Sequence, residues 1–323
     1  MKVAILDDYL GLSLSLTDWS SVTADCELTV FREAISPAEA AEALAPFEGL
    51  CLMRERTAFP AELIARLPNL KFLVTTGRPN RSIDLEACTA RGIVVSYTDG
   101  TSDGMVATPE MAFALILAAA RQLPQEARNL AEGGWQSRLG TTLYGKRLGL
   151  VGLGRIGQRM ARYAQAFEME VVAWSQNLTA EAASEAGAAL VSKGELFATS
   201  DFVSIHYVLS DRSRKLVGEA EIAAMKPSAY LVNTSRGPIV DQAALTRALQ
   251  DRTIAGAALD VFEVEPLPKD DPLRSLDNVI LTPHSGYATD ALFAEFYRQT
   301  CEALAAFIAG EPIRLLNPEV LAA

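Results

Sequence analysis

The sequence is poor in the residues that build metal centres and disulfide frameworks. Only four cysteines and two histidines occur among its 323 residues, and Cys26, Cys51, Cys88 and Cys301 are far apart. The sequence holds no CxxC pair and no zinc-ligand spacing, so we expect neither a metal site nor a disulfide scaffold. Free, largely buried thiols in a reducing compartment are the expected form of these cysteines.

Long apolar runs are also missing. The longest, residues 111–120, is about half as long as the ~20 residues that a membrane-spanning helix needs. Two acidic residues, Asp7 and Asp8, interrupt the apolar N-terminus and leave no signal-peptide core. We therefore expect a cytoplasmic protein that does not enter a membrane.

Basic residues are outnumbered by acidic ones, 29 to 40, which gives a formal net charge of −11. Such a surface repels phosphate backbones, so nucleic-acid binding is not expected. A small anionic substrate is compatible with this charge if local arginines hold it.

Short apolar segments alternate with amphipathic ones along the whole chain. The segments expected to be strands are residues 3–6, 28–31, 50–53, 72–75, 93–95, 147–151, 170–174, 202–206, 230–233, 256–259 and 279–281. This alternation predicts wound, parallel α/β sheets, and the chain length suggests two domains. A polar stretch at 97–104 is typical of a linker. After it we expect a helix with Thr108 as N-cap and Pro109 in its first turn, and residues 289–309 form a last amphipathic helix.

The strongest motif is Gly152-Leu153-Gly154-Arg155-Ile156-Gly157, which directly follows a predicted strand and opens an amphipathic helix. In that context a GxGxxG sequence is typical of dinucleotide binding. Gly152 allows the tight turn, Gly154 lets a diphosphate approach the backbone, and Gly157 lets the helix pack close to the strand. Free N–H groups at the start of the helix can bind the phosphates. The alternative is a plain glycine-rich turn.

Polar residues follow the predicted strands of this second series. They are the glycine loop, Ser175, His206, Thr234, Ser235, Arg236, Asp260 and His284. Because the carboxyl ends of parallel strands meet at one edge of a sheet, we expect a ligand site there. Only two histidines could serve as an acid–base group. His284, in a Thr-Pro-His-Ser-Gly segment before the last helix, is the candidate, whereas we expect a packing or cofactor-side role for His206.

These motifs resemble the D-isomer-specific 2-hydroxyacid dehydrogenase family, to which phosphoglycerate dehydrogenases and glyoxylate–hydroxypyruvate reductases belong. The matching segments are residues 152–157, 233–237, 260–267 and 282–284. The resemblance implies a flavodoxin-like substrate domain, residues 1–98 and 289–323, into which a Rossmann nucleotide-binding domain, residues 99–288, is inserted. It also implies an enzyme that transfers a hydride between NAD or NADP and C2 of a D-2-hydroxyacid in a cleft between the domains.

By the same resemblance, Arg236 binds the substrate carboxylate, Glu265 pairs with His284, and His284 exchanges a proton with the substrate oxygen. A neighbouring carboxylate favours a protonated imidazole, and an arginine fork suits a carboxylate. Asp260 resembles the residue that holds the nicotinamide amide. The other expected cofactor-binding residues are Thr108, Gly152, Gly154, Arg155, Ile156, Gly157, Ser175, Gln176, His206 and Thr234. Formate dehydrogenases of this fold resemble a Gln–His pairing, so Glu265 argues against formate.

Two loops after strands of the first series resemble substrate loops of the family, which makes Arg54, Gly77 and Arg78 candidate substrate-binding residues. A solvated basic loop is the alternative. The segment 121–146 has little core of its own, and in this family such a segment wraps the second subunit of a homodimer. By that resemblance Arg138 reaches the partner's active site and favours dianionic substrates; the alternative is an exposed, salt-bridged arginine.

The carboxylate that typically selects NAD in this family is replaced here by Ser175, which Gln176 and Asn177 follow. Because no charge of either sign stands at this position, we expect NAD and NADP to bind with similar affinity, and we name NAD first on family frequency. Three other functions stay open: a catalytically silent NAD-sensing protein of the same fold, an oxidant of phosphite or formate, and a scaffold.

Overall fold

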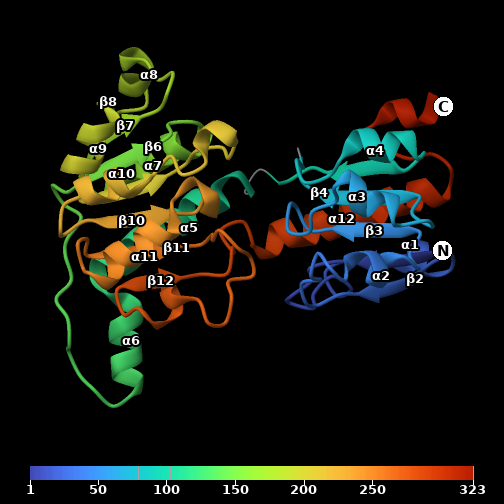
Figure 1. Ribbon diagram of the computed structural model, residues 1–323, viewed down its shortest axis with the longest axis horizontal. Helices are drawn as coiled ribbons and strands as arrows, with labels where there is room; N and C mark the ends of the chain where they lie inside the picture. Colours follow the sequence, from blue (N-terminus) through green and yellow to red (C-terminus); the bar gives the residue numbers. More distant parts are fainter. Residues whose placement is uncertain (79, 102–103, 323) are drawn as a thin grey trace. The chain divides into compact units, whose positions relative to one another are not determined.

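The structure is a computed structural model that describes residues 1–78, 80–101 and 104–322, and it divides into two compact units (Figure 1). Unit 1 comprises Met1–Gly104 and Thr289–Ala323, and unit 2 comprises Met105–Ala288. Unit 2 is therefore inserted into unit 1, with the first crossing after Gly104 rather than near residue 98. Pro79 of the expected substrate loop and residues 102–103 of the expected linker lie outside the described residues.

Five parallel strands form the sheet of unit 1, in the order β2-β1-β3-β4-β5. Their bounds are β1 Lys2–Ile5, β2 Glu27–Val30, β3 Gly49–Leu52, β4 Phe72–Thr76 and β5 Val94–Thr98. Strands β3 and β4 are buried along their whole length, as expected when both faces of a parallel sheet are covered. The order, with its reversal between β1 and β3, is the flavodoxin-like one, and the predicted fold class is confirmed for this unit.

Segments from both ends of the chain build unit 1. Its helices are α1 Ser20–Thr23, α2 Ala40–Leu44, α3 Ala61–Ala65, α4 Leu85–Ala90, α12 Asp290–Ile308 and the 3-10 helix η4 Pro318–Ala322. Helix α12 packs on β4 and β5, where Phe307 stacks on Phe72 with ring centroids 4.5 Å apart. The predicted helix over 289–309 is confirmed within one residue at each end, and the Thr289 side chain caps it by accepting from the Leu292 N–H.

Seven parallel strands form the sheet of unit 2, in the order β12-β11-β10-β9-β6-β7-β8. Their bounds are β6 Arg147–Val151, β7 Glu170–Trp174, β8 Ala189–Leu190, β9 Phe202–Ile205, β10 Tyr230–Asn233, β11 Gly256–Leu259 and β12 Val279–Leu281. This is the doubly wound arrangement predicted for the second series, and the direction of winding reverses between β6 and β9. Strand β8, which consists of two exposed residues at the edge of the sheet, was not predicted.

Helices cover the sheet of unit 2 and complete its core. They are α5 Gly104–Arg121, α6 Leu123–Ala131, α7 Arg155–Ala166, α8 Ala180–Glu185, α9 Lys193–Thr199, α10 Glu219–Ala224 and α11 Gln242–Gln250, with 3-10 helices η1 Asp211–Ser213, η2 Gly237–Ile239 and η3 Pro272–Ser275. Helices α5 and α7 contribute to one hydrophobic cluster, and α9, α10 and α11 contribute to another. The strand ends that carry the candidate site thus belong to a well-packed sheet.

The start of α5 corrects the prediction. Thr108 does not cap this helix, because α5 begins at Gly104 and both Thr108 and Pro109 lie inside it. Pro109 is the sixth residue of α5, and because it has no N–H the helix lacks the backbone hydrogen bond to the carbonyl oxygen four residues earlier. The faces of α5 also differ in burial. Ala112 and Ile116 are buried in the core of unit 2, whereas Ala114 on another face is exposed.

Helix α5 is also, by length and composition, long and apolar enough to cross a membrane, and 44% of it is buried within the protein. This differs from the sequence prediction, which counted only the uninterrupted apolar run. The residues that α5 contributes to the hydrophobic core of unit 2 include Ala112, Leu115 and Ile116. Helices of soluble protein cores meet the same criteria of length and composition.

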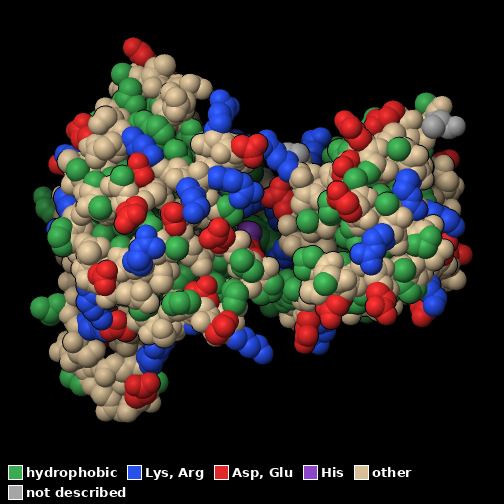
Figure 2. All heavy atoms as spheres, in the orientation of Figure 1, with side chains coloured by type: hydrophobic (Ala, Val, Ile, Leu, Met, Phe, Trp, Pro, Cys, Tyr) green, Lys and Arg blue, Asp and Glu red, His purple; other side chains and the backbone are tan. Residues whose placement is uncertain are grey.

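Helix α6 and the chain after it stand apart from the sheet of unit 2. Figure 1 shows α6 extending away from the sheet and the chain returning through a long segment without secondary structure. Helix α6 has no buried residue, Trp135 is 77% exposed and Leu139 is 97% exposed. The sequence analysis did not predict α6. Elsewhere, acidic and basic side chains are interspersed over the face shown in Figure 2.

Candidate active site

The glycine loop lies where the strand order of unit 2 reverses, directly after β6. Gly152 has a φ of +100°, and a Cβ there would lie 2.3 Å from the carbonyl oxygen of His206. A Cβ on Gly157 would lie 2.3 Å from the carbonyl oxygen of Gly152, so α7 can approach the strand only because residue 157 is glycine. Gly154, by contrast, faces open space. The loop therefore has two positions closed by backbone contacts and one that a ligand can approach.

The other expected cofactor residues lie at several places on unit 2. Arg155 and Ile156 form the first turn of α7, and Ser175 and Gln176 directly follow β7. Thr234 follows β10 and is 6% exposed, and its Oγ1 has no hydrogen-bond partner among the described residues. A buried hydroxyl without a partner is the kind of group that a bound ligand satisfies. These features fit a dinucleotide at the start of α7, as the sequence motif predicts.

His206 has the environment of a packing residue. It directly follows β9, where its N–H donates to the carbonyl oxygen of Val151 (2.8 Å) and its Nε2 lies 2.9 Å from Ser204 Oγ. Burial lowers the pKa of His206 to about 3, so the ring is neutral at physiological pH. Through its backbone, His206 supports the glycine loop at Gly152.

His284 has a different environment, a short contact with a carboxylate. It lies after β12, and its Nδ1 is 2.5 Å from Oε2 of Glu265. Both side chains are partly exposed, 23% for His284 and 30% for Glu265. The backbone of His284 has a φ of +51°, an unusual value for a residue with a side chain. Strained backbone of this kind is often found at functional sites.

Glu265 is held in its ionised form by its neighbours. Burial alone would raise its pKa, but the hydrogen bond and charge of His284, the Phe262 N–H and the charge of Arg236 together lower the pKa below its usual value. The Phe262 N–H donates to Oε1 at 2.8 Å, and His284 engages Oε2. Because Nδ1 faces a carboxylate, Nδ1 carries a proton, and Nε2 is the nitrogen left for acid–base chemistry.

Arg236 comes to the same place from a different strand. It follows β10 and precedes η2, and its Nη1 donates to the carbonyl oxygen of Ser235 (2.7 Å). The next residue, Gly237, makes the approach possible, because a Cβ there would lie 1.9 Å from the carbonyl carbon of Phe262. The loops after β10 and β11 are therefore in backbone contact. This brings together three predicted residues, Arg236, Glu265 and His284.

Asp260, the residue expected to hold a nicotinamide amide, is fully buried at the end of β11. Its carboxylate accepts hydrogen bonds from Thr282, Ser285 and Gly286, all on the segment that carries His284. Sequence reasoning did not select Thr282, Ser285, Gly286 or Phe262. Their spacing from Asp260 and Glu265 along the chain has no signature, and only the packing of the strand ends reveals them.

In unit 1, Arg54 and Gly77 lie together after β3 and β4. Gly77 has a φ of +75°, a conformation that favours glycine, and a Cβ there would lie 2.6 Å from Nη1 of Arg54, so the guanidinium lies directly against this turn. The Arg54 N–H donates to Thr76 Oγ1 (2.9 Å), and its carbonyl oxygen accepts from Asn80 Nδ2 (2.6 Å). Thr76 and Asn80, which sequence reasoning did not single out, therefore hold the Arg54 backbone.

Arg78 points elsewhere in unit 1. Its Nη1 donates to Tyr97 Oη (2.9 Å), its guanidinium lies over the Tyr97 ring, and its Nε is 3.3 Å from Asp99.

A further acidic residue that the sequence analysis did not select, Asp7, follows β1 and is 4% exposed. Burial raises the pKa of Asp7, although the hydroxyls of Thr57 and Tyr9 donate to its carboxylate.

Arg138 forms an ion pair within its own chain, with Nη2 2.8 Å from Oδ2 of Asp277. Arg252 also binds Asp277, at 2.7 Å. This is the alternative that the sequence analysis left open for Arg138. Within the described part of the chain, no group of three or more His, Cys, Asp or Glu side chains could hold a metal ion.

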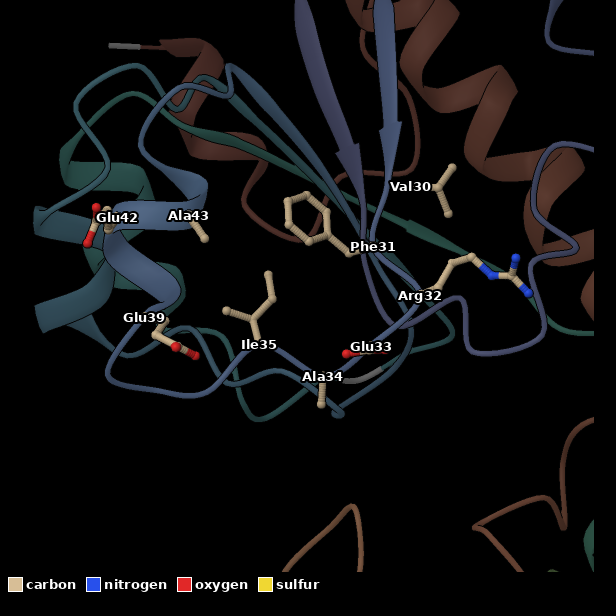
Figure 3. Close-up of a pocket in the computed structure, with 9 residues that line it drawn as sticks. All are labelled: Val30, Phe31, Arg32, Glu33, Ala34, Ile35, Glu39, Glu42 and Ala43. Carbon is tan, nitrogen blue, oxygen red and sulfur yellow. The ribbon is translucent and has the colours of Figure 1, made fainter.

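A pocket in unit 1 lies apart from these residues, between the end of β2 and α2 (Figure 3). Phe31 and Ile35 point into it, and Arg32 points away from α2 (Figure 3). Its lining residues are Val30, Phe31, Arg32, Glu33, Ala34, Ile35, Glu39, Glu42 and Ala43. None of the expected site residues lines this pocket.

Comparisons with known proteins agree with the motif and the geometry. Residues 113–286, more than half of the chain, match the family model described as D-isomer specific 2-hydroxyacid dehydrogenase, NAD binding domain. The chain belongs to the D-isomer-specific 2-hydroxyacid dehydrogenase family. The family that the sequence motifs resemble is therefore confirmed, and this member is an NAD-dependent oxidoreductase that transfers a hydride to or from a D-2-hydroxyacid.

Several relatives of this dehydrogenase illustrate the likeness. It is 40% identical to a glyoxylate reductase of Korarchaeum cryptofilum over 268 residues, which cover 81% of this chain and 80% of that protein. It is 41% identical to a D-3-phosphoglycerate dehydrogenase of Methanocaldococcus jannaschii over 242 residues, which cover 74% of this chain but 46% of that longer protein. The solved structure of a phosphoglycerate oxidoreductase from Vibrio cholerae has a TM-score of 0.89 and 38% identity, covering 96% of this chain and 99% of that one.

Proposed function

We propose that His284 is the acid–base residue of this dehydrogenase, that Glu265 orients it and favours its protonated form, and that Arg236 binds the substrate carboxylate. The observation that carries the proposal is the 2.5 Å contact between His284 Nδ1 and Glu265 Oε2, beside an arginine whose charge lowers the pKa of Glu265. An acid, its orienting carboxylate and a carboxylate-binding cation are the groups that reduction of a 2-keto acid requires.

The proton moves at a defined atom. In keto acid reduction, a hydride adds to C2 and the π electrons of the C=O bond move to the carbonyl oxygen. This oxygen takes the proton from His284 Nε2. In the oxidation of a hydroxyacid, neutral Nε2 accepts the hydroxyl proton. When bound, the nicotinamide supplies or accepts the hydride. Arg236 polarises the carbonyl and fixes the carboxylate, and its guanidinium can form two parallel hydrogen bonds with it.

The dinucleotide is proposed to bind along the carboxyl edge of the sheet in unit 2. Support comes from the open approach at Gly154, the start of α7 at Arg155 and Ile156, and the unpartnered buried hydroxyl of Thr234. Gly152, Gly157 and His206 build the loop, and Thr108, on α5, is proposed only on family resemblance. We further propose that NAD and NADP bind with similar affinity, because Ser175 and Gln176 are both uncharged.

Unit 1 is proposed to be the substrate domain, and the substrate a small D-2-hydroxyacid or 2-keto acid. Arg54 supports this proposal, because Thr76 and Asn80 hold its backbone and its guanidinium lies beside Gly77. The pairing of Arg78 with Tyr97 and Asp99 favours a positioning role for Arg78 over direct contact. The alignment with a glyoxylate reductase covers nearly equal shares of that protein and of this chain. We therefore propose glyoxylate-sized keto acids as the first substrates to test.

We also propose a cytoplasmic homodimer formed through α5, α6 and the segment after them. Two features support it: α6 has no buried residue, and Trp135 and Leu139 are strongly exposed in the single chain. Sedimentation at micromolar concentration tests this proposal, and a monomer would exclude it.

Arg138 would reach a partner's substrate only by leaving Asp277. Equal kcat/KM ratios for mono- and dianionic keto acids in wild type and Arg138→Ala would exclude that role.

A panel of 2-keto acids assayed with NADH and NADPH tests the reaction itself. Turnover of at least one keto acid that is lost in His284→Gln is the expected result. Binding of NADH without turnover of any member of the panel would instead favour the catalytically silent, NAD-sensing alternative. Reduction of NAD by phosphite or formate would instead favour the alternative of an enzyme that oxidises one of these two compounds.

A further inference from the structure

We propose that Asp260 is a positioning residue that holds the turn carrying His284, and through this turn sets the geometry of the His284–Glu265 pair. The inference rests on the proposed function of His284, and it adds to the expected contact of Asp260 with the cofactor. It is carried by the hydrogen bonds of Asp260, which are unusually concentrated on one short segment.

One buried carboxylate binds three residues around His284. Oδ1 of Asp260 accepts from Thr282 Oγ1 (2.6 Å) and from the Ser285 N–H (2.9 Å), and Oδ2 accepts from the Gly286 N–H (2.8 Å). Asp260 is 0% exposed, and its own N–H continues the sheet by donating to Asn233 O (2.9 Å). The turn at 282–286 is therefore attached to the end of β11.

The space around the Asp260 carboxylate is also restricted. A Cβ on Gly286 would lie 2.9 Å from Oδ2 of Asp260, so the close approach of the turn requires glycine. Within this turn the His284 N–H donates to Thr282 O (3.0 Å), and His284 adopts its φ of +51°. That backbone conformation is unfavourable for a residue with a Cβ and persists only where the surroundings impose it. Asp260 binds on both sides of the strained residue.

The two partners of the acid–base pair are attached to the same stretch of chain. Asp260 holds the backbone on both sides of His284, and Phe262, two residues later, donates its N–H to Glu265. The imidazole is thus fixed from its backbone by Asp260 and from Nδ1 by Glu265. Loss of Asp260 frees the backbone end, and small displacements of a catalytic group cost a large part of the rate.

A cofactor contact and this positioning role are chemically compatible. Oδ1 already accepts from two strong donors, whereas Oδ2 accepts from Gly286 alone and keeps one lone pair. The two roles differ in what their removal does: a pure cofactor contact changes the Kd of NADH, and a positioning residue changes His284 even when no cofactor is present.

Asp260→Asn is the decisive variant, because either amide rotamer directs an NH2 group at a backbone N–H or at the Thr282 hydroxyl. We expect kcat for keto acid reduction to fall about 10²-fold, with the Kd of NADH, measured by nucleotide fluorescence, within about threefold of wild type. Asp201→Asn is the matched control. Its carboxylate also accepts a backbone N–H, from Arg147 at 2.8 Å, but at the opposite edge of the same sheet, and it should leave kcat unchanged.

The composition allows a readout that needs no activity. The protein has two histidines, and burial lowers the pKa of His206 to about 3, so in ¹⁵N-histidine NMR spectra of the cofactor-free protein the His206 ring keeps the signals of a neutral imidazole between pH 5 and 9. In Asp260→Asn we expect the His284 signals, recorded at one fixed pH, to move toward those of Glu265→Gln. The His206 signals should stay in place.

Thr282→Val keeps the inference testable if Asp260→Asn does not fold. It removes one of the hydrogen bonds and should lower kcat several-fold while moving the His284 signals in the same direction. Wild-type His284 signals in both variants would overturn the inference. A raised Kd for NADH with unchanged His284 signals would also overturn it, in favour of a cofactor contact alone. Failure of the proposed function is distinguishable, because it would appear as full turnover in His284→Gln, whatever the signals of Asp260→Asn.

Discussion

The two histidines of the chain follow strands β9 and β12 and therefore lie at the same edge of one sheet, yet their surroundings differ. His206 binds a neutral serine hydroxyl, and burial lowers its pKa to about 3. His284 is partly exposed and contacts the carboxylate of Glu265 at 2.5 Å. The same side chain is thus a neutral packing group in one loop and a candidate proton donor in the other. The partner and the degree of burial decide the chemistry, while the place at the sheet edge is shared.

Replacing each ring tests this comparison most strongly. His284→Gln should lower kcat for keto acid reduction by about 10²–10⁴-fold, because the proton donor is lost. His206→Gln should keep kcat within a few-fold of wild type, since a glutamine can still bind Ser204. Steady-state kinetics with NADH measure both. Near-normal turnover in His284→Gln, or a collapse in His206→Gln with the fold intact, would reverse the assignments.

Replacing the side chain that each histidine contacts should change the pH dependence of the reaction in only one of the two cases. The pKa of Glu265 lies below its usual value, so this carboxylate is ionised throughout the neutral range and favours the imidazolium form of His284. Glu265→Gln removes that charge. The pH–rate profile for reduction should move to lower pH, and kcat at pH 7.5 should fall roughly tenfold or more. Ser204→Ala, the matched change beside His206, should leave the profile unmoved; equal shifts in both variants would contradict the comparison.

A third strand end of the same sheet, that of β7, is followed by two uncharged residues, Ser175 and Gln176. These residues test whether the absence of charge decides the choice of cofactor. We expect wild type to bind NADH and NADPH with Kd values within about tenfold of each other. A charge introduced here should change the ratio by about 5–150-fold, toward NADPH in Gln176→Arg and toward NADH in Ser175→Asp. Fluorescence titration with both nucleotides measures the ratio. A preference above about a hundredfold in wild type would show that other groups select the cofactor.

The smallest expected effect is on stability. The folded-state pKa of His206 lies well below the usual 6.5, so the unfolded chain binds a proton that the folded protein excludes. Stability should therefore fall as the pH drops from 6.5, by up to about 2 kcal/mol at pH 5 from this residue. Urea unfolding at pH 7 and pH 5 measures the loss. His206→Gln should lose correspondingly less, and an identical loss in the variant would mean that His206 is protonated in the fold.

Strand positions in unit 2 were predictable because each central strand of a buried parallel sheet is a short, continuous apolar run. β6, β7, β10, β11 and β12 lie where the sequence pattern predicted them. Helix α5 was placed too late, because the Thr108-Pro109 pair has the form of a helix start, and the polar residues just before Gly104 were assigned to a linker although Thr, Ser and Asp are also typical helix caps. Helix α6 was not predicted, although Leu123, Ala127 and Leu130 recur at helical spacing; these apolar positions are few, and none of them is buried within the single chain.

Among the candidate site residues, the sequence by itself determined the family, the glycine loop and the choice of His284, because these depend on residue type and on position after a strand. Only the tertiary structure decided which groups meet. The Gly237–Phe262 approach that brings Arg236 to Glu265, the hold of Asp260 on the His284 turn and the pairing of Arg138 with Asp277 join segments that are separate in the sequence. Such contacts depend on how separate segments pack in the folded protein. The distance between two packed segments cannot be predicted from the order of residues alone.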